Sequence, residues 1–263
     1  MDLGYQGRRV LVIGASTGIG FAAAKLLAAE GAELVIASRD PAAIADAAAR
    51  IGAETGRSPA TATADITQEG AADRLLAEVA GRWGALDGLV DAVGGSIRSG
   101  FEALSDADWL TNYQFNVLSA VRAVRAALPL LRQGQAPSVV LLGAAASRMP
   151  YPNQIVSNVH KAGLLGLTKT LAGEYAAEGI RVNCVAPGRT LTRLWQLRAE
   201  KLAAESGRSV AEVIADFAHE VPLGRFATAE EVAVMVLWLG SPRAAYVTGQ
   251  TVNVDGGIAR GLL

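Results

Sequence analysis

Short apolar runs alternate with longer, mostly amphipathic segments along the chain. The first run, Val10 to Ile13, passes through a glycine-rich turn into a helical segment that begins near Phe21. An apolar run of roughly four to eight residues between turn residues is typical of a buried parallel strand. The pattern predicts strands at residues 10–13, 33–37, 60–63, 86–91, 138–142, 180–185 and 251–257, and helices at about 21–27, 42–54, 68–81, 106–132, 153–178 and 229–239.

The alternation of strand and helix runs through the chain without a tandem repeat, a low-complexity linker or a break in composition. Repeated βα units of this kind favour a parallel sheet that is covered by helices on both faces and joined by right-handed connections. The sequence therefore predicts one doubly wound (Rossmann) α/β domain over residues 1–263.

One segment, residues 193–225, interrupts this alternation. Large apolar side chains recur there at helical spacing, at Leu194, Trp195, Leu197, Leu202, Val210, Ile214 and Phe217. Insertions beyond the carboxyl ends of parallel strands often carry binding loops. We expect a small helical substrate lobe or lid at about residues 190–226, the alternative being an extra pair of core helices.

The glycine-rich turn, Gly14 to Gly20, lies between the first predicted strand and the first predicted helix. Glycines let a phosphate approach the backbone, and the free N–H groups and positive dipole end of the helix stabilise its charge. The turn therefore predicts a site for a dinucleotide pyrophosphate. Glycines at such a turn can also serve tight packing alone.

The tip of the second predicted strand, Ser38-Arg39-Asp40, bears on the choice of dinucleotide. A carboxylate at this point accepts the ribose hydroxyls of NAD, whereas an arginine holds the 2′-phosphate of NADP. Arg39 favours NADP(H). Asp40 leaves NAD(H) open, and Arg39 has a second interpretation as a solvated loop charge.

Composition excludes several classes of partner. Charged residues make up 19% of the chain and the formal net charge is −1, so no basic field favours nucleic acid or an anionic membrane. The first residues lack a signal-peptide pattern, and no apolar segment approaches the roughly 20 residues of a membrane span. We expect a cytoplasmic protein that acts on a small molecule, with no nucleic-acid or membrane partner.

The sequence offers no metal-ligand spacing. Its single cysteine, Cys184, stands apart from its two histidines, His160 and His219. One cysteine also excludes an internal disulfide. We expect no metal site.

Several further motifs occur together in this chain. They are Gly14-x-x-x-Gly18-Ile19-Gly20, Asn116 in the long helix after strand four, Lys161-Ala162-Gly163-Leu164, Arg181-Val182-Asn183 leading to Pro187-Gly188, and Thr248-Gly249-Gln250 before Asp255-Gly256-Gly257. With them the chain resembles, end to end, the short-chain dehydrogenase/reductase family. The resemblance implies a seven-stranded parallel sheet with the active site at its carboxyl ends, and a homotetramer formed by pairing the long helices.

The resemblance also implies which residues bind the cofactor. The glycine turn would hold the pyrophosphate, Arg39 the 2′-phosphate, Asp65 and Ile66 the adenine, and the segment after strand six the nicotinamide. The implied set is Gly14, Ser16, Thr17, Gly18, Ile19, Ser38, Arg39, Asp65, Ile66, Gly94, Lys161, Pro187, Gly188, Thr190 and Thr192.

The family's chemistry uses an asparagine, a serine, a tyrosine and a lysine, the last two as Tyr-x-x-x-Lys. Asn116 and Lys161 match this pattern, whereas Ser157 stands at the tyrosine position and Ala144 at the serine position. An aliphatic hydroxyl is a much weaker acid than a phenol, so ordinary ketone reduction is not expected. Ser157 and Lys161 share one face of a helix, being four residues apart.

Other residues are candidates for the missing chemistry. Tyr151 and Ser147 lie in the preceding loop, and we take Asn116, Ser157, Lys161 and Tyr151 as the candidate catalytic set. Arginines in the predicted rim could clamp an anionic group such as a coenzyme A phosphate or a carboxylate, each having a second interpretation as a surface charge; they are Arg98, Arg148, Arg189 and Arg193.

Two functions follow from these residues. The first is an NADP(H)-dependent oxidoreductase that transfers hydride to an activated, enoyl-like or carbonyl, small molecule. The 2,4-dienoyl-CoA reductase branch of the family is similar in carrying serine before the lysine, although its own tyrosine position is Ala146 here. The second is a cofactor-binding homologue without turnover, acting as a sensor or partner subunit.

Overall fold

The computed structural model describes residues 2–261, in which the predicted strands form one parallel sheet. The strands are β1 (Arg9–Ile13), β2 (Glu33–Ser38), β3 (Ala60–Thr63), β4 (Gly88–Asp91), β5 (Ser138–Leu142), β6 (Arg181–Pro187) and β7 (Thr251–Val254). They pair in the order β3-β2-β1-β4-β5-β6-β7, and every pairing is parallel. The prediction of a doubly wound α/β fold with a seven-stranded parallel sheet is confirmed.

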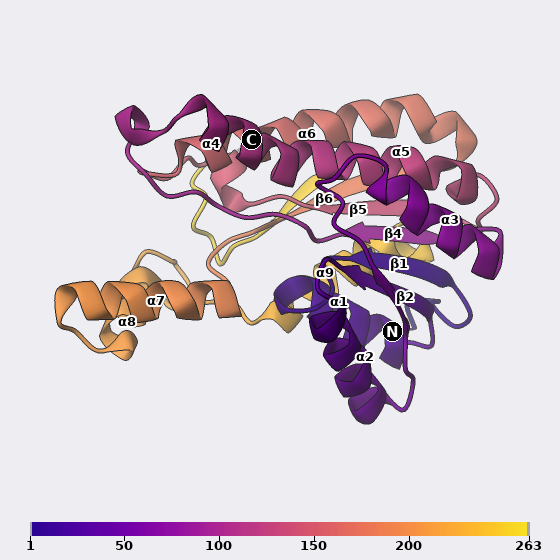
Figure 1. Cartoon of the computed structure of the whole chain (residues 1–263), viewed down its shortest axis with the longest axis horizontal. Coiled ribbons are helices and arrows are strands. Elements are labelled where there is room, and N and C mark those ends of the chain that lie inside the picture. The colour runs from indigo at the N-terminus through magenta and orange to yellow at the C-terminus, as the bar shows by residue number, and fades with distance from the viewer. Residues whose placement is uncertain (1, 262–263) are drawn as a thin grey trace.

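Helices cover both faces of the sheet (Figure 1). The α-helices are α1 (Gly18–Ala29), α2 (Pro41–Thr55), α3 (Ala71–Trp83), α4 (Asp106–Tyr113), α5 (Ser119–Leu131), α6 (Ile155–Tyr175), α7 (Arg193–Ser206), α8 (Val210–His219) and α9 (Ala229–Gly240). In Figure 1, α1, α2 and α9 lie below the sheet and α3, α5 and α6 lie above it. No helix in residues 2–261 is both long enough and apolar enough to cross a membrane.

Alternating side chains of the buried strands supply the two layers of the core. In β1, Val10 and Val12 pack on one face with α1 and α9, whereas Leu11 and Ile13 pack on the other face with α3 and α5. This is why β1 is a continuous apolar run: both of its faces are covered. Because β1 is held on both faces, it also fixes the position of the glycine turn that follows its carboxyl end.

Several predicted element limits differ from the structure. The helix expected at 68–81 begins at Ala71, because Gly70 before it has φ of +70° and cannot continue a helix backward. The last strand ends at Val254 rather than 257, since Gly256 and Gly257 both have positive φ. The helix expected at 106–132 is divided into α4 and α5 by a π-helical turn, η2 (Gln114–Leu118).

The helices α7 and α8 form a separate lobe that projects from one end of the sheet (Figure 1). They pack on each other through Ala199, Ala203 and Val213. Large apolar side chains of α7 stay in solvent, Leu194 being 62% exposed. Helices that pack in a core bury such residues. The exposed apolar side chains of this lobe are therefore suited to contact a ligand or another surface.

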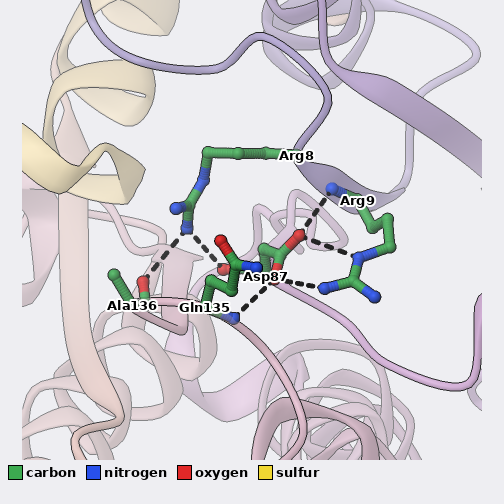
Figure 2. Close-up of polar contacts among 5 residues, drawn as sticks. All are labelled: Arg8, Arg9, Asp87, Gln135 and Ala136. Atoms are coloured by element: carbon green, nitrogen blue, oxygen red, sulfur yellow. Dashed lines mark hydrogen bonds and ion pairs between the residues drawn. The ribbon is translucent and has the colours of Figure 1, made fainter.

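An ionic cluster joins the amino ends of the central strands (Figure 2). The Asp87 carboxylate accepts hydrogen bonds from the backbone N–H and the guanidinium of Arg9 and from the backbone N–H of Gln135. The Arg8 guanidinium donates to the carbonyls of Asp87 and Ala136. Burial raises the pKa of Asp87, but these hydrogen bonds outweigh it and hold the pKa below its usual range. The cluster aligns β1, β4 and β5 at the edge opposite their carboxyl ends.

Candidate active site

A cavity of about 290 Å³ opens at the carboxyl ends of the central strands. It is lined by the start of α1 and the residue before it (Thr17, Gly18, Ile19, Gly20), the loop after β4 (Ala92, Val93, Gly94, Gly95, Ser96, Arg98), the end of β5 and the loop after it (Leu142, Gly143, Ala144, Ala146, Tyr151), the start of α6 (Gln154, Ser157, Lys161), and the stretch from the end of β6 to the start of α7 (Pro187, Gly188, Arg189, Thr190, Thr192, Arg193, Leu194, Trp195). The topology therefore brings together most of the predicted site residues.

The glycine turn presents unbonded backbone donors to this cavity. Gly14 has φ of +82°, and a Cβ there would lie 3.0 Å from the carbonyl of Ala92, so only glycine suits the position. The first helical residue is Gly18, and the side chain of Thr17 makes no capping hydrogen bond. The free N–H groups of the first turn fit a pyrophosphate. Gly14 and Ser16 do not line the cavity.

The two charged residues that follow β2, Arg39 and Asp40, make different contacts. The Asp40 carboxylate caps α2 by accepting hydrogen bonds from the backbone N–H groups of Ala42 and Ala43. Ser38 is buried, and its hydroxyl donates to the Asp40 carbonyl. Arg39 is exposed and has no ion-pair partner in residues 2–261. The cap occupies Asp40 and leaves Arg39 available to an anion.

The predicted adenine contacts are partly engaged in the fold. The Asp65 carboxylate accepts hydrogen bonds from the backbone N–H and hydroxyl of Thr67. These bonds, with the nearby charge of Arg39, lower the pKa of Asp65 although burial opposes them. Ile66 packs its side chain in the core, so only its backbone faces outward.

Asn116 fixes the loop after β4. Its Oδ1 accepts a hydrogen bond from the backbone N–H of Gly95, and its Nδ2 donates to the carbonyls of Gly95 and Asn112. Asn116 is buried in the π-helical turn η2, and such turns often occur at functional sites. A Cβ on Gly94 would lie 2.5 Å from Lys161 Nζ. A side chain at position 94 would therefore clash with the Lys161 ammonium, and glycine leaves room for it.

Lys161 is buried at the floor of the cavity. Its ammonium donates to the carbonyl of Leu142 at 2.8 Å. Burial lowers the pKa of Lys161, while the charges of Cys184 and Asp91 oppose that effect. Burial likewise raises the pKa of Asp91 to about 6, against its hydrogen bond from Val93 and the charge of Lys161.

The hydroxyl of Ser157 is already engaged. It donates to Ser96 Oγ at 3.1 Å and accepts from the backbone N–H of Ile97 at 3.2 Å. Ser96 in turn donates to Gln154 Oε1. Ser157 therefore holds the 96–97 loop against the start of α6.

Tyr151 carries a phenol hydroxyl that makes no hydrogen bond within residues 2–261. Its Oη atom is buried. Burial raises the pKa of Tyr151 although the charge of Arg189 opposes it, so the phenol is protonated at neutral pH. By contrast, Ser147 donates its hydroxyl to the Ala144 carbonyl and does not line the cavity.

The histidine next to Lys161 lies outside the cavity. His160 Nδ1 lies 2.8 Å from Asn112 Oδ1, and its ring meets the edges of Trp109 and Tyr113. Burial lowers its pKa. His160 packs α6 against α4.

The predicted rim arginines separate into two groups. Arg98, Arg189 and Arg193 line the cavity, whereas Arg148 does not. A further arginine, Arg198, stacks with its guanidinium carbon 4.3 Å from the ring centroid of Trp195. The sequence analysis missed Arg198, although its position three residues after Trp195 places both on one face of a helix.

The fold, the glycine turn and the cavity at the sheet's carboxyl ends define a dinucleotide-binding α/β protein. The family model described as Enoyl-(Acyl carrier protein) reductase matches residues 14–259. The chain belongs to the short-chain dehydrogenase/reductase family.

Known relatives match along nearly the whole chain. The 3beta-hydroxysteroid dehydrogenase 1 of Eggerthella lenta is 33% identical over 254 residues, which cover 96% of this chain and 94% of the relative. The structure of L-sorbose reductase from Gluconobacter frateurii, complexed with NADPH and L-sorbose, is 31% identical and has a TM-score of 0.96, with 100% of both chains covered. An NADPH-bound short chain oxidoreductase from Pseudomonas aeruginosa PAO1, described as containing an atypical catalytic center, is 27% identical with a TM-score of 0.90, covering 98% of this chain and 99% of that one.

Proposed function

We propose that the protein is an NADP(H)-dependent oxidoreductase that transfers hydride to an activated small molecule, a conjugated enoyl or carbonyl compound. Family membership supports the reaction type. The NADPH complexes of the Gluconobacter frateurii and Pseudomonas aeruginosa proteins support the cofactor. When bound, NADPH supplies the hydride.

The residues around the cavity fit this cofactor. The unbonded N–H groups at the start of α1 would hold the pyrophosphate, and Arg39 would hold the 2′-phosphate. Pro187, Gly188, Thr190 and Thr192 would bind the nicotinamide side, because they line the opposite wall of the same cavity. Lys161 would reach the nicotinamide ribose past Gly94.

The proton source is the atypical part of the proposal. Reduction of a carbonyl adds hydride to carbon and a proton to oxygen. By its resemblance to the family, the chain has Ala144 and Ser157 where the serine and tyrosine stand, and the Ser157 hydroxyl already donates a hydrogen bond to Ser96 Oγ. An aliphatic hydroxyl used in this way is a poor acid, so Ser157 acts as a positioning residue for the loop.

We assign the proton donor to Tyr151. The single observation that carries this assignment is that Tyr151 lines the cavity while its buried phenol has no hydrogen-bond partner in residues 2–261. A buried hydroxyl without a partner costs free energy that a ligand oxygen would recover. Enoyl reduction is the less demanding case, since hydride adds to the β carbon and the resulting enolate can take its proton from Tyr151 or from water.

Single-turnover oxidation of NADPH with ketone, enoyl and imine-like substrates tests the proposal. Tyr151→Phe should slow carbonyl reduction by about 10²- to 10⁴-fold, the usual contribution of a general acid. Ser157→Ala should slow it less. Tyr246→Phe is the matched control, because Tyr246 is fully exposed and lies outside the cavity lining.

A restored active site gives a second measurement. Ala144→Ser combined with Ser157→Tyr should raise the reduction of simple ketones if the cavity admits the phenol. Undiminished carbonyl reduction by Tyr151→Phe would refute the assignment of the proton donor. Binding of NADPH without turnover of any substrate class would refute the proposed reaction itself.

A further inference from the structure

Three arginines converge on one tryptophan beside the candidate active site. The guanidinium carbons of Arg98, Arg189 and Arg198 lie 5.6, 5.2 and 4.3 Å from the ring centroid of Trp195. Arg98 comes from the loop after β4, Arg189 from the segment after β6, and Arg198 from α7. Tertiary contacts alone gather these charges, since they come from three separate segments.

The acidic residues nearby leave most of this positive charge unbalanced. Arg189 forms an ion pair with Glu220. In residues 2–261, neither Arg98 nor Arg198 has an ion-pair partner. The carboxylates of Glu200 and Asp216, also in the lobe, pair with other arginines, Arg193 and Arg208. Three guanidinium groups therefore face one carboxylate.

Buried donors in the cluster also lack partners. Arg189 is only 8% exposed, yet its Nε has no hydrogen-bond partner among the described residues, and the same holds for Nη1 of Arg198. Burial and the neighbouring arginines lower the pKa of both Arg98 and Arg198 to about 10. Both groups still carry full charge at neutral pH, so their mutual repulsion persists.

Stacking on an aromatic ring offsets only part of the free-energy cost of burying unpartnered donors and of bringing like charges together. A cation near an aromatic face gains electrostatic attraction from the ring, but this contact leaves the N–H donors of the guanidinium unsatisfied. A bound oxyanion would give the unpartnered Nη1 of Arg198 an acceptor and would neutralise the charge at once, because the planar guanidinium fork matches a carboxylate in two hydrogen bonds. The cluster therefore has the composition of an anion site beside an aromatic platform.

We propose that the substrate is a small oxo or enoyl acid whose carboxylate is bound by Arg98 and Arg198, with its body against Trp195. This inference rests on the proposed function, since it names the substrate class of the same cavity. Arg98 and Trp195 line the cavity together with Tyr151, whereas Arg198 does not line it and lies against Trp195. A carboxylate on Arg98 is therefore within the reach of a small molecule from the proposed proton donor. Arg189 supports the cluster through Glu220.

Calorimetric titration with benzoate and its neutral isostere benzamide tests the anion site without requiring turnover. Both titrations are performed with the full chain, with and without saturating NADP⁺. The wild type should bind benzoate about 10- to 100-fold more tightly than benzamide, as charge-assisted hydrogen bonds predict. Arg98→Met and Arg198→Met should each remove most of this preference. Arg208→Met is the matched control, because it removes an exposed arginine of the same lobe that is paired with Asp216.

Thermal unfolding of each variant separates loss of the site from loss of the fold. Arg98→Met and Arg198→Met should not lower the Tm, because each removes an unpaired charge. Equal affinity of the wild type for benzoate and benzamide would overturn the proposal, and so would a preference that survives both substitutions. Binding of inorganic phosphate, titrated with the cofactor site filled by NADP⁺, in the absence of benzoate binding would overturn the carboxylate assignment.

Failure of this inference differs from failure of the proposed function. Titration with NADP⁺ alone measures the cofactor site, and Arg98→Met should leave that affinity unchanged. If NADP⁺ does not bind but the preference for benzoate holds, the proposed reaction is wrong and the anion site stands. If NADPH oxidation favours the methyl ester of an oxo acid over the free acid, the reaction stands and the anionic substrate class is wrong.

Discussion

At the scale of single residues, hydroxyl groups differ in the partners that they already have, and their proposed roles differ accordingly. Two residues that carry hydroxyl groups line the candidate active site, Ser157 at the start of α6 and Tyr151 in the loop before it. The Ser157 hydroxyl donates a hydrogen bond to Ser96, whereas the Tyr151 phenol has no hydrogen-bond partner in residues 2–261. The roles that we propose, a positioning residue for Ser157 and a proton donor for Tyr151, rest on these contacts.

The choice of dinucleotide is tested at Arg39. We predict that Arg39→Ala weakens NADPH binding by about 10- to 100-fold, because a charge-assisted contact to the 2′-phosphate contributes about 1.5–3 kcal/mol. Binding of NADH should stay nearly unchanged, since NADH lacks that phosphate. Titration calorimetry with both cofactors measures the difference. Arg57→Ala, another exposed arginine, is the control, and equal losses for NADPH and NADH would contradict the role given to Arg39.

At the scale of elements, α7 and α8 are the pair least tied to the sheet. Their shared core is small, consisting of Ala199, Ala203 and Val213 with a few partly buried neighbours. The connection between them, residues 207–209, is exposed. Few buried contacts and an exposed connection are typical of segments that open locally. We propose that residues 190–226 form a substrate lobe that closes over the nicotinamide.

Limited proteolysis tests this lid. Trypsin should cut first after Lys201 or Arg208, because both are exposed and lie in the lobe. NADP⁺ together with benzoate should slow the cut, because closure would pack α7 over the cavity. Mass spectrometry of the fragments identifies the sites, and Arg208→Gln serves to assign them. A first cut in the sheet, or a rate that no ligand combination changes, would mean that the lobe is fixed structure.

At the scale of the whole molecule, α6 has an outer face of small residues. Ala162, Gly163 and Gly166 are exposed, and a Cβ on either glycine would meet nothing within 4 Å. Glycine in a helix interior costs about 0.5–1 kcal/mol relative to alanine, a cost that close packing against another helix can offset. This face is therefore suited to pairing between subunits.

We predict a homotetramer with paired α6 helices. Light scattering at working concentrations should give four times the 27.1 kDa mass of the chain. Gly163→Arg should reduce that mass, because its side chain fits the isolated chain but blocks close approach of a second helix. Gly81→Arg, in the α3 helix, is the control, since Gly81 likewise has nothing within 4 Å. A monomer mass for the wild type would refute the prediction.

The sequence by itself determined the order of strands and helices, the doubly wound fold and the place of the glycine turn. Each depends on local patterns: apolar runs such as Val10 to Ile13 have to be buried on both faces, and the turn after β1 is set by Gly14 and its neighbours. The hydropathy pattern predicted the limits of helices and strands less well. A single glycine such as Gly70 sets a limit by its positive backbone φ, which hydropathy does not reveal.

Only the tertiary structure decided which polar groups are used and which remain free. Periodicity predicted one continuous helix through Asn116, and the π-helical turn there appears only where its side chain binds Gly95. The meeting of Arg98, Arg189 and Arg198 at Trp195 joins segments up to 100 residues apart. Hydrogen bonds and charge pairs between distant segments depend on distances in space, and the order of residues along the chain does not fix those distances.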